Sequence, residues 1–158
     1  MPPEEARTVH RCRVEWPDTD ASGHYHNTAV VRFVEAAEAA LIRGGGLVGY
    51  FGAAPRVRYE VDFAAPLWFG QEVTTSIAVE KIGTSSMTFT FEVWGEATDS
   101  HPRQLAASGR YTVVHVPPRG ERVSAPWPAE WITALKVTPA ATPTPTDVET
   151  DTGSSRQP

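Results

Sequence analysis

The sequence predicts an α+β domain in which a five-stranded antiparallel sheet wraps around one long central helix. Only one long stretch, residues 27–43, carries apolar residues at helical spacing. After residue 55 the apolar period changes to two, and four alternating segments follow with short turns between them, which is typical of an antiparallel meander. Such a sheet has one apolar face, and this helix is the only strongly amphipathic element available to cover it.

The first expected strand spans residues 8–16, where His10, Cys12, Val14 and Trp16 alternate with a more charged set. Cys12 falls on the apolar side of this strand and is expected to be a core residue. Residues 16–26, here called the acidic loop, contain two aspartates, two histidines, a proline and a glycine. This composition excludes a regular helix or strand.

The predicted helix follows the acidic loop directly. Its apolar residues fall at i, i+3, i+4, i+7 and i+11, and they are Val30, Phe33, Val34, Ala37 and Leu41. Asn27 is a candidate N-cap, because its side chain can accept a hydrogen bond from the first turn. Three glycines at residues 44–46 end the helix. The positive end of the helix dipole therefore lies next to the acidic loop, where it favours an oxyanion or a polarised carbonyl.

The remaining strands are expected at residues 57–63, 73–79, 87–93 and 105–116, and a short closing helix at residues 127–135. These elements form one domain, residues 1–136. Residues 137–158 are rich in Thr, Pro, Asp and Ser and are predicted to be a disordered tail.

Composition narrows the functional classes. A net charge of −5 argues against a surface dedicated to nucleic acid or to anionic membranes. A single cysteine excludes an internal disulfide and fits a reducing compartment. Residues 1–9 lack the apolar core of a signal peptide, and no apolar run approaches the ~18 residues that span a bilayer. We therefore expect a cytoplasmic protein with no nucleic-acid or membrane partner.

The chain contains, in this order, a strand ending in an aromatic residue, the motif D-x-D-x-x-G-H-x-x-N at residues 18–27, and a helix continuing into R-F-x-E at residues 32–35. The order of these features resembles that of the hot-dog fold thioesterases. Residues 62–73 and 81–93 also look like later strands of that family, and the likeness covers residues 9–116. The nearest branch is the 4-hydroxybenzoyl-CoA thioesterase and acyl-CoA thioesterase group. The G-H-x-x-N motif is closer to the motif of aliphatic acyl thioesterases than to that of the benzoyl-CoA enzymes.

The resemblance implies hydrolysis of an acyl-CoA or acyl-carrier-protein thioester, without a metal or other cofactor, by a homodimer or homotetramer with its active site between subunits. It places the catalytic carboxylate on Asp20 and a carbonyl-polarising N–H within residues 26–28. Asn27 is then expected to help bind the carbonyl or the water. A carboxylate can attack a thioester or activate a water molecule, but Asp18 and Asp20 are also common turn formers. We expect Asp18 to be structural.

Several further residues remain candidates. Glu35, in a second helical stripe with Asn27, Val31, Glu38 and Ile42, is either a reserve catalytic carboxylate or part of a solvated edge. His24 and His26 lack a third metal ligand, so they are expected to line the substrate pocket or, alternatively, to supply a general base. The other expected substrate contacts are Tyr25, Thr28, Ser85, Ser86, Arg58 and Lys81, the last two as phosphate-binding cations.

Two other functions stay open at this stage. One is a hot-dog dehydratase or hydratase that uses a loop histidine, and the other is a non-catalytic acyl-CoA-binding protein.

Overall fold

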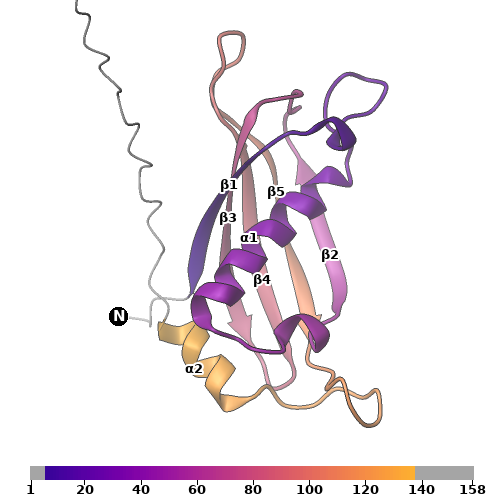
Figure 1. Cartoon of the computed structure of the whole chain (residues 1–158), viewed down its shortest axis with the longest axis vertical. Coiled ribbons are helices and arrows are strands. Elements are labelled where there is room, and N and C mark those ends of the chain that lie inside the picture. Colours follow the sequence, from indigo (N-terminus) through magenta and orange to yellow (C-terminus); the bar gives the residue numbers. More distant parts are fainter. Residues whose placement is uncertain (1–5, 138–158) are drawn as a thin grey trace, which may run out of the picture.

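The computed structural model describes residues 6–137 as one helix-on-sheet layer pair with a short closing helix (Figure 1). The main helix is α1 (Ala29–Gly45) and the closing helix is α2 (Ala129–Val137). The strands are β1 (Arg7–Arg13), β2 (Arg56–Phe63), β3 (Glu72–Ile82), β4 (Ser86–Gly95) and β5 (Gln104–Val114). The predicted tail, apart from Val137, lies outside the described residues.

All five strands belong to one antiparallel sheet with the order β1-β3-β4-β5-β2. The meander β3-β4-β5 forms its centre, while β1 and β2 are the edges. The α+β prediction and the five-stranded sheet are therefore confirmed.

Helix α1 covers the inner face of the sheet and packs mainly against β1, β3 and β4. Its buried residues include all five that the helical period predicted, and Gly46 ends the helix in the left-handed conformation at φ 67°. The core therefore lies between this helix and the inward residues of the central strands, which include Val73, Ile77, Phe89 and Val93.

The edge strand β2 is less covered than the central strands. All eight of its residues keep at least partial solvent exposure, and Val57 and Phe63 are 62% and 49% exposed. Its pairing with β5 depends on Gly109, because a Cβ there would lie 2.0 Å from the Glu60 carbonyl oxygen and 2.8 Å from the Phe91 ring.

The two ends of the sheet differ. The acidic loop and the N-terminus of α1 lie at one end, here called the acidic-loop end, and α2 lies at the other, the α2 end (Figure 1). At the α2 end an aromatic cluster is formed by His115, Trp127, Trp131 and Tyr50, with the His115 and Trp127 rings stacked at 5.1 Å.

No helix in the described part of the chain is long and apolar enough to cross a membrane.

The predicted end of the first strand was wrong. The first strand ends at Arg13, because Val14 leaves the ladder to exchange backbone hydrogen bonds with Gly70 and Gln71. Trp16 lies in a short 3-10 turn (Trp16–Asp18), where it is 78% exposed and contacts Phe69 edge-on. Cys12 is half-buried and packs against the core, as expected.

Candidate active site

The acidic loop folds back on itself as a small hairpin beside the helix N-terminus. Thr19 pairs with Tyr25, the Asp20 N–H donates to His24 O at 3.2 Å, and Gly23 takes φ 85° at the turn. The Tyr25 N–H donates to Leu67 O at 2.8 Å, and His24 forms a backbone bridge with Trp68. The loop is thus fixed to the segment between β2 and β3.

Asp20 lies at the exposed tip of this hairpin. Its carboxylate accepts hydrogen bonds from the Ser22 N–H at 2.8 Å and from the Ser22 hydroxyl. These two bonds lower the pKa of Asp20 below its ordinary value of 3.8. The carboxylate is therefore ionised and open to solvent, as required of a base or nucleophile.

Asp18 has the opposite environment. It is buried, and it accepts hydrogen bonds from Arg32 Nε at 2.7 Å, from a second Arg32 nitrogen, and from the Glu15 N–H at 2.7 Å. Burial alone raises the pKa of Asp18, but these hydrogen bonds outweigh it and the pKa lies below 3.8. The contacts agree with the structural role expected for Asp18.

The helix N-terminus presents unbonded amides. Helix α1 begins at Ala29, whose N–H donates to His26 O at 3.0 Å. Among the described residues, no hydrogen bond engages the N–H groups of Asn27 and Thr28. The predicted Asn27 cap was wrong, because Thr28 is the N-cap and makes no side-chain cap bond. The exposed Asn27 side chain is left free to contact a ligand.

The three aromatic residues at the end of the loop have separate environments. The half-buried His24 ring packs edge-on against Trp68 at 5.6 Å. Tyr25 is buried, its ring lies 6.4 Å from Phe63, and its hydroxyl donates to Ala106 O at 3.4 Å. Both ring nitrogens of His26 are engaged, one by Pro17 O at 3.1 Å and one by the Thr28 hydroxyl. Within residues 6–137 no cluster of three or more His, Cys, Asp or Glu residues is placed to hold a metal.

Glu35 lies farther along α1, half-exposed, with its carboxylate 3.3 Å from Arg56. The neighbouring acid Glu38 is only 2% exposed and receives hydrogen bonds from the Tyr50 hydroxyl at 2.7 Å and from Arg56. The prediction of a solvated edge was therefore wrong at Glu38 and at Ile42, which is also 2% exposed. The signal for Glu38 was its spacing, since it lies four residues after Val34 and three before Leu41 in the apolar stripe.

The expected phosphate contacts lie elsewhere in the chain. Lys81, Ser85 and Ser86 flank the β3–β4 turn at the α2 end, where Ser85 O accepts from the His115 N–H. Arg58, near the start of β2, pairs with Glu60 at 2.6 Å. A single chain therefore does not bring these residues together with Asp20.

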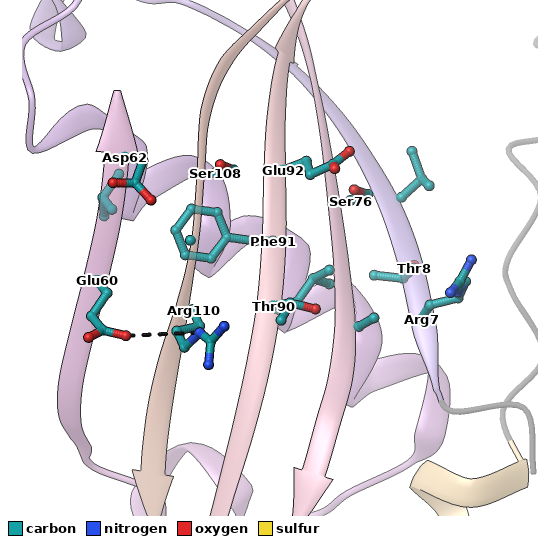
Figure 2. Close-up of a pocket in the computed structure, with 15 residues that line it drawn as sticks. Arg7, Thr8, Glu60, Asp62, Ser76, Thr90, Phe91, Glu92, Ser108 and Arg110 are labelled. Atoms are coloured by element: carbon teal, nitrogen blue, oxygen red, sulfur yellow. Dashed lines mark ion pairs between the residues drawn. The ribbon is translucent and has the colours of Figure 1, made fainter. Parts of the chain in front are cut away.

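A groove of about 980 Å³ lies on the outer face of the sheet, opposite α1 (Figure 2). Its lining mixes acids, bases and hydroxyls, including Glu60, Asp62, Glu92, Ser108 and Arg110, with Arg110 3.9 Å from Glu60. No residue of the acidic loop lines it. The groove is therefore separate from the candidate site.

Comparisons with known proteins agree with this architecture. The family profile of the thioesterase-like superfamily matches residues 14–135. A mutant 4-hydroxybenzoyl-CoA thioesterase complexed with 4-hydroxybenzoyl-CoA superimposes with a TM-score of 0.73 at 18% identity, covering 82% of this chain and 99% of that one. A comparison with curated proteins finds no match.

Two further solved structures are similar. A 1,4-dihydroxy-2-naphthoyl-CoA thioesterase from Synechocystis gives a TM-score of 0.70 at 20% identity, covering 82% of this chain and 95% of that one. A predicted thioesterase from Bacillus stearothermophilus gives 0.71 at 25% identity, with 83% and 95% covered. The hot-dog fold and the thioester hydrolase assignment expected from the sequence are thus confirmed at the level of fold and family, and this chain belongs to the thioesterase-like superfamily.

Proposed function

We propose that this protein is an acyl-CoA thioesterase in which Asp20 is the catalytic carboxylate and the free amides at the start of α1 stabilise the oxyanion. The observation that carries the proposal is that an ionised, accessible Asp20 and the unbonded N–H groups of Asn27 and Thr28 lie on one short segment of the chain. Oxygen-stabilising amides of this kind lower a barrier by about 3 kcal/mol each.

The chemistry balances with water as the only co-reactant. Asp20 accepts a proton from a water molecule as that water adds to the thioester carbonyl, and the amides of Asn27 and Thr28 hold the resulting oxyanion. The intermediate collapses with cleavage of the carbon–sulfur bond. The proton on Asp20 passes to the departing CoA thiolate, which restores the carboxylate. Direct attack by Asp20, followed by hydrolysis of the anhydride, uses the same residues.

Acyl-CoA is the proposed substrate class because the structural neighbours named above include a complex with 4-hydroxybenzoyl-CoA and an enzyme for a naphthoyl-CoA. Glu35 is left out of the proposed chemistry, since its carboxylate is paired with Arg56. We also propose a cytoplasmic location, where a free thiol such as Cys12 stays reduced.

We further propose a homodimer formed by pairing of the exposed β2 edges. An unpaired edge strand offers a full row of backbone donors and acceptors, and Val57 and Phe63 add exposed apolar surface beside it. Antiparallel pairing about a two-fold axis sets the α2 end of one copy beside the acidic-loop end of the other. The Lys81–Ser86 turn and Arg58 of a second copy then lie on the side of the assembly that carries Asp20.

The test is release of free thiol from a panel of aryl-CoA and alkyl-CoA thioesters, read with a thiol reagent, with the same acyl groups on a carrier protein as a comparison. Thiol release that rises in proportion to enzyme supports the proposal. Hydration of an enoyl-CoA without thiol release would indicate a hydratase instead. Binding of acyl-CoA with no turnover would indicate a binding protein.

A further inference from the structure

His26 connects every part of the backbone that surrounds the two free amides. Its own N–H donates to Asp18 O at 2.8 Å, and its carbonyl accepts the first helical N–H, from Ala29, at 3.0 Å. Its ring bridges Pro17 O and the Thr28 hydroxyl. One residue therefore joins the 3-10 turn, the loop and the start of α1.

The ring contacts define one tautomer. Pro17 O only accepts hydrogen bonds, so the Nε2 that lies 3.1 Å from it carries the proton. In a neutral ring Nδ1 is then an acceptor, and the Thr28 hydroxyl donates to it. Thr28 is consequently drawn toward the ring and away from the usual capping position, in agreement with its lack of a side-chain cap bond.

This arrangement adds restraints to a segment that has few others, among them the hydrogen bond from the Val31 N–H to Thr28 O at 3.1 Å. Asn27 and Thr28 precede the first residue of α1, and their N–H groups have no partner within the described chain. Helix ends held by few hydrogen bonds fray. The His26 ring spans this segment from one side to the other, so it limits the directions in which the two N–H bonds point.

We propose that His26 is a positioning residue that orients the Asn27 and Thr28 amides toward the developing oxyanion. This inference rests on the proposed thioesterase function. His26 acts on the transition state through these amides and does not bind the ground-state thioester, so its loss lowers kcat while KM changes little.

The experiment compares His26→Ala, His26→Gln and Thr28→Val with the parent enzyme in steady-state hydrolysis of benzoyl-CoA and hexanoyl-CoA. We expect kcat to fall by about tenfold or more in each variant, with KM within about twofold. The double variant His26→Ala/Thr28→Val is expected to lose no more than the worse single variant, because both changes remove the same bridge. Thr28→Ser, which restores the hydroxyl, recovers most of the activity lost in Thr28→Val.

A second readout does not depend on turnover. Amide hydrogen exchange at position 26 and at Ala29, whose N–H groups donate to Asp18 O and His26 O, should accelerate in the His26 and Thr28→Val variants, while exchange in β3 and β4 stays unchanged. His10→Ala, on β1 and away from the loop, is the matched control and leaves kcat and exchange as in the parent. Thr28→Val removes only one hydroxyl contact, so it carries the test if His26→Ala does not fold.

Additive losses in the double variant would overturn the inference, as would a kcat of His26→Gln and Thr28→Val within about twofold of the parent. Unchanged amide exchange at position 26 and at Ala29 would also overturn it. If the parent enzyme releases no thiol, the proposed function fails, whereas the exchange experiment still decides whether the His26 ring holds the segment that precedes α1.

Discussion

Two guanidinium nitrogens of Arg32 hold the buried carboxylate of Asp18, which joins the start of α1 to the acidic loop. One of these two nitrogens, Nη2, also donates to the Arg13 carbonyl at 3.1 Å, at the end of β1. The strand, the loop and the helix therefore meet at one ion pair. These contacts hold the acidic loop, on which the exposed Asp20 lies, against β1 and α1.

Asp18→Asn should destabilise the fold by about 2 kcal/mol, because Arg32 loses its charged partner and one of the two oxygens that accept from Arg32 and the Glu15 N–H becomes an NH2 donor. The lowered pKa of Asp18 means that its contribution is complete above pH 3.8 and is lost as pH falls through the still lower value in the folded protein. Urea unfolding between pH 2 and 7 measures this. A parent and variant whose stability difference does not shrink toward the acid limit would contradict the assignment.

Asp20→Asn should lower kcat by about 100-fold or more, because the proposed base or nucleophile is lost. The melting temperature should stay near that of the parent, since the side chain is exposed and, within residues 6–137, its hydrogen bonds go to Ser22 alone. Steady-state kinetics and thermal unfolding supply both readouts, with Asp99→Asn, another exposed loop acid, as the control. Full activity in Asp20→Asn would transfer the catalytic role to Glu35.

Ser22→Ala should shift the acid limb of the kcat/KM profile to higher pH. The Ser22 hydroxyl lowers the pKa of Asp20, so its removal leaves the carboxylate protonated up to a higher pH and inactive over that range. A pH profile of both proteins against one substrate is the measurement. An acid limb that does not move would mean that a different group governs it.

Glu38→Gln should become more stable relative to the parent as pH rises. Burial raises the pKa of Glu38 above 4.5, and the Arg56 and Tyr50 contacts offset only part of that rise. A carboxyl with a raised folded pKa stabilises the fold at low pH and loses that contribution as pH climbs from 4.5 through the folded value. Unfolding free energies at pH 4, 6 and 8 test this, and a difference that is constant with pH would refute it.

Val57→Glu should convert the proposed dimer into monomers, since it places a charge on the exposed face of the β2 edge. Light scattering coupled to size-exclusion chromatography measures the mass. In Val57→Glu we expect both the mass and the rate of thiol release from acyl-CoA to fall. Val9→Glu, on the opposite edge strand β1, is the control and should leave the mass unchanged. Loss of assembly in Val9→Glu alone would place the interface on β1, and a mass above a dimer in the parent would show a second interface.

The fold was predictable because the helical spacing of apolar residues and their two-residue alternation occupy separate parts of the sequence. Helical spacing ends at the glycines of residues 44–46, and the four segments of alternating apolar residues that follow, separated by turns, are β2 to β5. Strand ends were less predictable, since Val14 continues the alternation of β1 but bonds to Gly70 and Gln71 instead of β3. No local pattern encodes that choice.

The site was predictable only in part. The motif places Asp20, His24, His26 and Asn27 on one loop, as the structure does. The motif gives no information on the ring contacts of His26. It also does not reveal that Thr28, and not Asn27, is the N-cap. Both features depend on hydrogen bonds across the loop. Glu38 was misassigned because its partners Tyr50 and Arg56 come from later segments of the chain.

The first and last described elements meet at the α2 end, where the Ala6 N–H donates to Leu135 O at 3.0 Å. Segments that begin and finish in contact tolerate being joined by a short linker, with new termini opened in an exposed surface turn such as the one at Gly120. A circularly permuted enzyme of this kind leaves residues 16–28 uncut. The order of the chain can therefore be changed at the α2 end, while the acidic-loop end keeps its native backbone connections.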